Sequence, residues 1–121
     1  MAIRDALKRL TTPVGELDRQ ALRSFCGAVE GVVPIAELQP RQDAKVVGEV
    51  TSMRIVPRPD CAGWLEVTIS DGTGSVVAMW TGRVRVAGVA AGRRLVVCGR
   101  GAPRGRSGRL VILNPRYELL A

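Results

Sequence analysis

Residues 64–80, WLEVTISDGTGSVVAMW, predict two antiparallel β-strands joined by a tight turn. In WLEVTIS the apolar residues Leu65, Val67 and Ile69 alternate with more polar ones, which is the period-two pattern of a half-buried strand. The sequence DGTG at 71–74 supplies the aspartate and glycines that hairpin turns favour, and SVVAMW returns as the second strand. We therefore expect a β-hairpin with one face in a core.

Short apolar segments on both sides extend this pattern to five strands. Upstream, AKVVGEVTSMRIV at 44–56 is a long candidate strand, and Gly48 within it predicts a bend that lets one strand serve both halves of a small barrel. Downstream, RRLVVCGRG at 93–101 and RLVIL at 109–113 follow. TGRVRVAGVAAG at 81–92 is too rich in glycine to predict a helix, and RVRV within it reads as a short strand. Apart from RVRV, the other five strands, with regularly spaced turns, predict a closed barrel without exposed sheet edges.

The first 34 residues predict a helical arm, and residues 35–121 a separate β-domain. Apolar residues recur at helical spacing in 2–10 and again from about Val14 to Cys26, before the glycines and proline at 27–34. The apolar positions of the two helices are Ile3, Ala6, Leu7 and Leu10, then Leu17, Ala21, Leu22 and Phe25. Their stripe is expected either to cover one end of the β-domain or to dock a partner.

The positive charge of the chain is concentrated in the β-domain. The net charge is +7; residues 1–43 are neutral, and residues 44–121 carry twelve basic and five acidic residues. Between Asp71 and Glu118 there is no acidic residue. That stretch contains nine arginines: Arg83, Arg85, Arg93, Arg94, Arg100, Arg104, Arg106, Arg109 and Arg116. Codon bias explains a preference for arginine over lysine but not the missing acids, so we expect a polyanionic partner.

Several function classes have no support in the sequence. The three cysteines stand more than thirty residues apart, which excludes a CxxC zinc ribbon, and the chain has no histidine. Asp60, Glu66 and Asp71 form no acid/base or metal-binding pattern, and GAPRGRSGR at 101–109 lacks the P-loop lysine. Because there is no long apolar run, we expect a soluble cytoplasmic protein. Because these motifs are missing, we expect that it is not an enzyme and has no cofactor.

Over about residues 35–120 the sequence resembles the OB-fold nucleic-acid-binding family. The resemblance rests on DGTG, on GVAAGRRLVVCG at 88–99 and on NPRYE at 114–118. It extends to small actinobacterial OB-fold proteins and to the wedge OB domain of RecG-type branched-DNA helicases. The resemblance implies a mainly β fold, a five-stranded Greek-key barrel with an N-terminal helical arm. It also implies oligonucleotide binding by strands two and three and by the loops at 57–63 and 101–108.

Two tryptophans and the loop arginines are the main candidates for binding. Trp64 lies on the polar face of its strand, where it would either stack on an unpaired base or cover the barrel end beside Phe25. Trp80 shares parity with Val76 and Ala78, but the strand ends there, which favours partial exposure. The candidate nucleic-acid-binding residues are Arg54, Arg58, Trp64, Thr68, Trp80, Arg83, Arg85, Arg104, Arg106 and Arg109.

The sequence therefore predicts a non-enzymatic protein that binds single-stranded or branched DNA through basic loops and strand-face aromatics. RNA fits the same chemistry, because stacking and phosphate contacts do not require deoxyribose. A helicase, nuclease or other protein is an expected partner, and a membrane is not. The alternative is a protein-interaction module whose helical arm and basic barrel dock an acidic partner.

Overall fold

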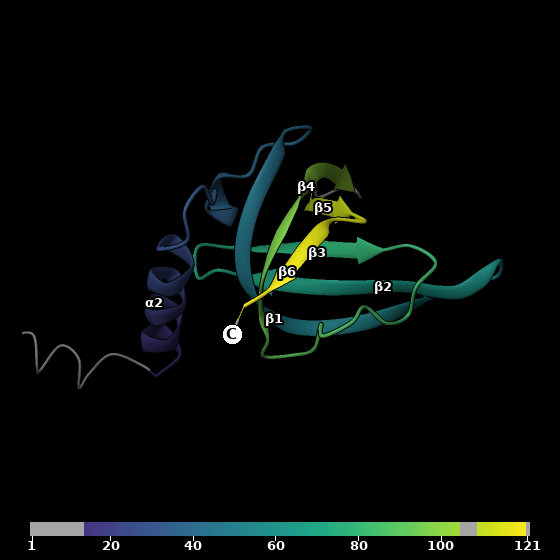
Figure 1. Cartoon of the computed structure of the whole chain (residues 1–121), viewed down its shortest axis with the longest axis horizontal. Helices are drawn as coiled ribbons and strands as arrows, with labels where there is room; N and C mark the ends of the chain where they lie inside the picture. Colours follow the sequence, from purple (N-terminus) through teal and green to yellow (C-terminus); the bar gives the residue numbers. More distant parts are fainter. Residues whose placement is uncertain (1–13, 105–108, 121) are drawn as a thin grey trace, which may run out of the picture.

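The computed structural model describes residues 14–104 and 109–120, and within them the chain is mainly β (Figure 1). One α-helix and one short 3-10 helix precede six strands. The elements are α2 (Val14–Gly27), η1 (Ile35–Glu37), β1 (Asp43–Arg58), β2 (Cys61–Ser70), β3 (Ser75–Trp80), β4 (Arg94–Arg104), β5 (Arg109–Leu113) and β6 (Arg116–Leu119). The predicted helix at 2–10 lies outside the described residues. None of the described helices is long and apolar enough to cross a membrane.

The six strands form a single sheet that closes on itself. Its order is β1-β2-β3-β5-β4-β6, and a further pairing of β1 with β4 closes the sheet. Neighbouring strands are antiparallel except β3 and β5, which run parallel. The closure leaves β6 as a short additional strand beside β4, where the sequence predicted only the end of the chain.

Strand β1 serves both halves of the sheet, as the sequence predicted. Its residues 43–49 pair with β4, and residues 49–58 pair with β2. At Gly48 an added Cβ would collide with Ile69 Cγ2 and lie 2.9 Å from the carbonyl oxygen of Ser70, so the close approach of backbone to β2 requires glycine. The register shifts between Val50 and Ser52, which marks the bulge.

The alternation read in β2 is confirmed by burial. Leu65, Val67 and Ile69 are buried in the main core, and the residues between them are half-buried. A second cluster joins Leu22 and Cys26 of α2 to Val47 and Val96 of the sheet. Leu22 and Phe25 of the predicted apolar stripe therefore pack against the sheet, whereas Ala21 is exposed. This part of the stripe agrees with the first of its two interpretations.

The DGTG hairpin turn is also confirmed, and it does more than reverse the chain. Asp71 is only 4% exposed. Its Oδ1 accepts hydrogen bonds from the backbone N–H groups of Thr73 (2.8 Å) and Gly74 (3.2 Å), while Oδ2 accepts one from Ile35 N–H (2.9 Å). A single buried carboxylate thus ties the β2–β3 turn to η1.

The segment between β3 and β4 differs from the prediction. RVRV at 83–86 is not a strand; residues 81–93 form a succession of turns. Gly82, Gly88 and Gly92 have φ values of 73°, 76° and 87°, a backbone conformation that strands do not contain. The local alternation of arginine and valine suggested a strand, but the glycines redirect the chain before pairing can be established.

Candidate nucleic-acid interface

The β1–β2 hairpin extends further than the sequence predicted. Residues 57–63 were expected to form a loop, but β1 continues to Arg58 and β2 begins at Cys61, with these two residues in register. Cross-strand pairing therefore leaves only Pro59 and Asp60 in the turn. Figure 1 shows this hairpin projecting from the sheet on the side away from α2. Arg58 consequently lies on an exposed strand end rather than in a loop.

Trp64 and Arg58 lie together on this hairpin. The guanidinium carbon of Arg58 is 4.0 Å from the centroid of the Trp64 ring. Trp64 is half-buried and packs against Val77, Met79 and Val111 of β3 and β5. It does not pack beside Phe25, which belongs to the cluster under α2, so the interpretation as a cover for that end is wrong. The indole is held on the sheet and contacted by a cation, a pairing that is strengthened as water is removed.

Arg54 and Thr68 belong to the same face. Arg54 lies opposite Glu66 in the register, and one of its Nη atoms is 3.1 Å from a Glu66 carboxylate oxygen. The Arg54 side chain is 71% exposed, so this ion pair adds little stability and leaves most of the guanidinium in solvent. Thr68 is half-buried two residues further along β2. The structure thus brings together four predicted residues, and it adds Glu66, an acid that the prediction left outside the site.

Trp80 does not belong to this interface, and the prediction of partial exposure is wrong. Its side chain is 3% exposed and lies in the main core. It meets the ring of Tyr117 edge to face, with centroids 5.7 Å apart and an interplanar angle of 79°. This contact with Tyr117 of β6 was not revealed by the sequence pattern. Trp80 is thus a core residue and cannot stack on a base.

Arg83 and Arg85 are both exposed, on the turn-rich segment 81–93. They alternate with Val84, which is half-buried, and Val86, which is buried, so both arginines project outward as predicted although no strand forms. The segment is fixed by contacts such as the Tyr117 hydroxyl donating to the Ala87 carbonyl oxygen (2.9 Å). Among the described residues neither arginine has an ion-pair partner within 4.0 Å.

The second predicted loop is shorter than expected, because β4 extends through Arg104 and β5 begins at Arg109. These two residues are paired in the register at the end of the β4–β5 hairpin. Arg106 lies between them, outside the described residues. The backbone therefore places Arg104 and Arg109 at the mouth of that connection, and the three arginines remain candidates.

The other arginines of the acid-free stretch have structural contacts or lie at strand ends. Arg94 is 3.5 Å from a Glu49 carboxylate oxygen and lies over the Phe25 ring at 4.3 Å. Arg100 is 3.3 Å from an Asp43 carboxylate oxygen. Arg93, directly before β4, and Arg116, at the start of β6, are exposed. The acids that pair with Arg94 and Arg100 come from β1. The net positive charge around this stretch in the folded chain is therefore smaller than its own sequence suggests.

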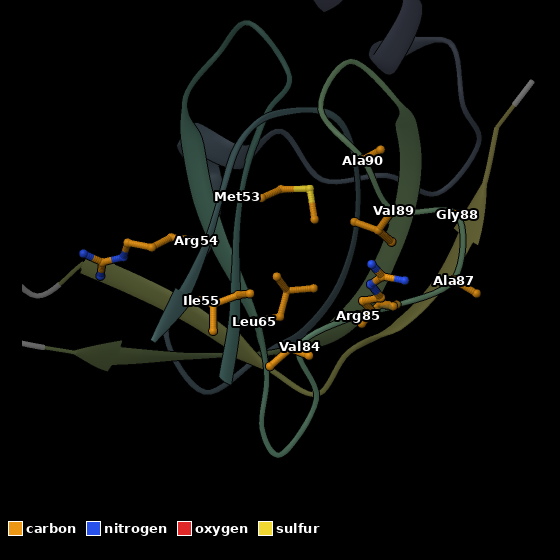
Figure 2. A pocket seen from close by; sticks show the side chains of 11 residues that line it. Met53, Arg54, Ile55, Leu65, Val84, Arg85, Ala87, Gly88, Val89 and Ala90 are labelled. Carbon is orange, nitrogen blue, oxygen red and sulfur yellow. The ribbon is translucent and has the colours of Figure 1, made fainter. Parts of the chain in front are cut away.

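A groove that the sequence did not predict lies beside β1. It encloses about 620 Å³ between the β1–β2 hairpin and residues 84–90. Figure 2 shows Met53 and Ile55 of β1 near Leu65, with Val84 and Val89 across the groove. Met53 and Ile55 are 38% and 52% exposed. These are large values for apolar residues that lie opposite the core residues Val67 and Leu65 in the strand register. The only sign of this apolar face in the sequence is that Met53 and Ile55 alternate with the polar Arg54.

The cysteines are all free thiols: Cys26 is buried, Cys61 exposed and Cys98 half-buried. Burial, together with a smaller contribution from the nearby Asp71 carboxylate, raises the pKa of Cys26 to about 11. In the part of the chain that the structure describes, no three histidine, cysteine or acidic side chains gather into a group that could hold a metal ion.

The comparisons with known proteins identify the fold class as OB-like. No protein-family model matches the sequence, and no curated protein matches it. Among solved structures, RecG bound to a three-way DNA junction matches with a TM-score of 0.61 and 18% identity over 74% of this chain. The likeness spans 12% of the RecG chain.

Two further solved structures match at similar coverage. The OBody AM1L10, bound to hen egg-white lysozyme, gives a TM-score of 0.53 at 17% identity and covers 76% of this chain and 95% of its own. A replication protein A heterotrimer bound to single-stranded DNA gives 0.49 at 13% identity, covering 77% of this chain and 68% of that one. At such identities the first two likenesses show the fold and leave function to be argued from the residues.

Proposed function

We propose that this chain is a non-enzymatic nucleic-acid-binding protein of the OB type, binding single-stranded or branched DNA on the outer face of the β1–β2 hairpin. In this proposal the closed sheet is the five-stranded Greek-key barrel of that fold with β6 added. The observation that carries the proposal is the contact between Arg58 and Trp64, 4.0 Å from guanidinium carbon to ring centroid on a projecting hairpin.

The chemistry of this face suits an unpaired strand. A base can stack on the indole of Trp64, and a single such contact contributes about 1–3 kcal/mol. Arg58 and Arg54 lie close enough to the same platform to contact the flanking phosphates. Counterions released from those phosphates would supply the electrostatic part of the affinity. RNA remains compatible, because no contact on this face depends on the sugar.

The fold comparison supports DNA as the ligand. RecG, whose structure was solved with a three-way DNA junction, has a domain-sized segment of the same fold as this chain. Because that likeness spans 12% of RecG, it supports a binding role and not the activity of the whole protein. A helicase or nuclease partner would supply any chemistry at the DNA, because a small OB module has the binding surface alone.

Two acids of the β-domain, Asp71 and Glu66, have structural partners, which supports a non-enzymatic role. Asp71 is held by three backbone N–H groups at the turn, and Glu66 is paired with Arg54. A general acid or base needs a carboxylate free to exchange a proton with a substrate. Both carboxylates instead have structural partners.

The experiment is a salt series. Fluorescence anisotropy of labelled single-stranded, duplex and forked DNA and of RNA gives the observed binding constant at each salt concentration. For single strands the log–log slope should be about −0.7 for each neutralised phosphate. Arg58→Ala should make that slope shallower, and Arg116→Ala, which removes the same charge from an exposed position on β6, should not. Absence of binding to every oligonucleotide at low salt would contradict the proposal.

A protein-interaction module remains the second candidate function. The OBody structure, in complex with lysozyme, is an OB-like domain engaged with a protein. The specific observation that favours this candidate is the exposed apolar groove beside β1, because exposed apolar surface often marks a protein contact.

A further inference from the structure

The outer edge of β1 is unpaired over half of the strand. Pairing with β4 ends at Glu49, after which Val50 exchanges hydrogen bonds of 2.9 Å with Gly92 and Arg93. From Thr51 to Arg58 the only strand beside β1 among the described residues is β2. The other edge therefore presents backbone N–H and C=O groups without a strand partner. Such an edge is a template for an added strand.

The groove lies directly beside this edge. Its floor is Leu65, which is 2% exposed, and its β1 wall consists of Met53 and Ile55. The opposite wall comes from the segment 84–90, in which Val89 is buried and Val84 is half-buried (Figure 2). A partner strand on the edge of β1 would direct every second side chain toward these residues. Backbone pairing and side-chain burial are thus available at the same place.

Charge restricts the occupant further. The charged residues that line the groove are Arg54 and Arg85, and no acidic residue lines it. Figure 2 shows the Arg85 side chain beside the apolar floor, whereas the Arg54 side chain extends from β1 away from it, on the side where it pairs with Glu66. A segment that places an acidic residue opposite Arg85, beside its apolar ones, complements this arrangement.

We propose that this groove binds an extended segment of a partner protein, which adds as a strand to β1 and places alternate aliphatic side chains against Met53, Ile55 and Leu65. An acidic residue beside these side chains would pair with Arg85. Pro57 lacks a backbone N–H, so pairing is confined to Thr51–Val56, enough for three inward-facing side chains. This is strand addition to an exposed sheet edge, in which the backbone supplies affinity and the groove supplies specificity.

Two other occupants fit less well. A nucleic acid would find no aromatic ring among the lining residues, and stacking is the usual device for holding bases. A second copy of this chain would bring the Arg54 and Arg58 side chains of both molecules to one edge, between chains that each carry a net charge of +7. Like charges at a shared interface oppose association.

The test uses the full chain and a fluorescein-labelled peptide, Asp-Glu-Val-Thr-Val-Thr-Val-Glu-Asp, whose three valines alternate. There are two control peptides. The first has the same composition but its valines do not alternate, and the second keeps the alternating valines but has lysines in place of the terminal acidic residues. We expect saturable binding of the first peptide only. Ile55→Asp should weaken that binding at least tenfold, while single-stranded DNA binding should stay unchanged, because Ile55 lies outside the Trp64 face. Failure of this proposal is therefore distinguishable from failure of the proposed function.

Amide hydrogen exchange locates the contact. The peptide should protect alternate amides among Thr51–Val56, those not already bonded to β2, together with amides of residues 84–90. Equal peptide binding by the Ile55→Asp variant, or protection elsewhere, would overturn the proposal. So would protection of these amides by single-stranded DNA, or a concentration-dependent dimer, measured by sedimentation, that Ile55→Asp dissociates.

Discussion

Arg58 and Trp64 meet near the end of the β1–β2 hairpin, with the guanidinium carbon 4.0 Å from the centroid of the indole ring. Trp64 is anchored by Val77, Met79 and Val111, whereas Arg58 is exposed. The ring is therefore the fixed member of the pair and the cation the mobile one. In the proposed complex, an incoming base would displace the guanidinium toward a phosphate without disturbing the sheet.

Replacing Trp64 by leucine should separate stacking from packing. Leucine keeps apolar contact with Val77 and Met79 but offers no ring face. We expect the affinity for a single-stranded oligonucleotide to fall roughly 5- to 150-fold, which corresponds to about 1–3 kcal/mol, with no change in the salt slope. Anisotropy titrations measure both quantities. Trp64→Phe should retain most of the affinity, and wild-type affinity in the leucine variant would rule out the stacking role.

Glu66→Gln should strengthen binding. The neutral side chain frees Arg54 from its ion pair of 3.1 Å and removes a negative charge from the binding face. The slope for single strands should become steeper by up to about 0.7, the contribution of one more neutralised phosphate. Glu118→Gln is the matched control, because Glu118 is exposed on β6. Equal effects of the two substitutions would show that net charge, and not this face, governs binding.

Asp71→Ala should destabilise the fold. The substitution leaves the backbone N–H groups of Ile35, Thr73 and Gly74 without their acceptor in a half-buried turn. A loss of about 3 kcal/mol in the free energy of unfolding is expected, since several hydrogen bonds to one charged group are removed together. Urea denaturation measures it as a lower midpoint at unchanged slope. Ser75→Ala, at the neighbouring exposed position, should stay within about 0.5 kcal/mol of the wild type.

Gly48→Ala tests the bend in β1. The new Cβ would collide with Ile69 Cγ2, so we expect a loss of about 1–3 kcal/mol from overpacking. Gly27→Ala is the control: it has no atom within 4 Å of the new Cβ and lies in the last turn of α2. That substitution should be neutral or stabilise by up to about 1 kcal/mol. Thermal unfolding of both variants decides between a required glycine and a tolerated one.

The thiols should differ sharply in reactivity. With its pKa raised to about 11 by burial, Cys26 holds roughly one thiolate in a thousand at pH 8, and Cys61 is exposed. Iodoacetamide with mass spectrometry should label Cys61 first and Cys26 only on unfolding. Because the folded pKa lies above the ordinary value of 9.0, the thiol contributes stability below pH 9 that is lost as the pH rises toward 11. Rapid labelling of native Cys26 would contradict this environment.

The features read correctly from the sequence are those fixed by local physics. The alternation of Leu65, Val67 and Ile69 follows from the period of a strand, and the DGTG turn follows from its aspartate and glycines. Gly48 could be assigned to a bend because an interior glycine is costly in a strand unless close packing requires it. Each of these sequence signals lies in the same short segment as the strand, turn or bend that it predicts.

The features that the sequence did not reveal depend on contacts between distant residues. Trp80 lies in the main core, where Tyr117 of β6 contacts its ring, and the buried Asp71 binds Ile35, thirty-six residues away. The groove exists because residues 84–90 lie across from β1 without covering Met53 and Ile55. Glu66 was known to share a face with Trp64, but its pairing with Arg54 depends on the register of β1 against β2.

The most direct test of the proposed function uses the tryptophans themselves. The chain has two, of which Trp80 is 3% exposed and Trp64 is half-buried on the hairpin face. Titration of the wild-type protein with an unlabelled single-stranded oligonucleotide at low salt should quench its intrinsic fluorescence to a plateau, and Trp64→Phe should abolish the change while retaining binding by anisotropy. Quenching that persists in Trp64→Phe, or binding that leaves the wild-type fluorescence unaltered, would contradict the placement of the nucleic acid on this face.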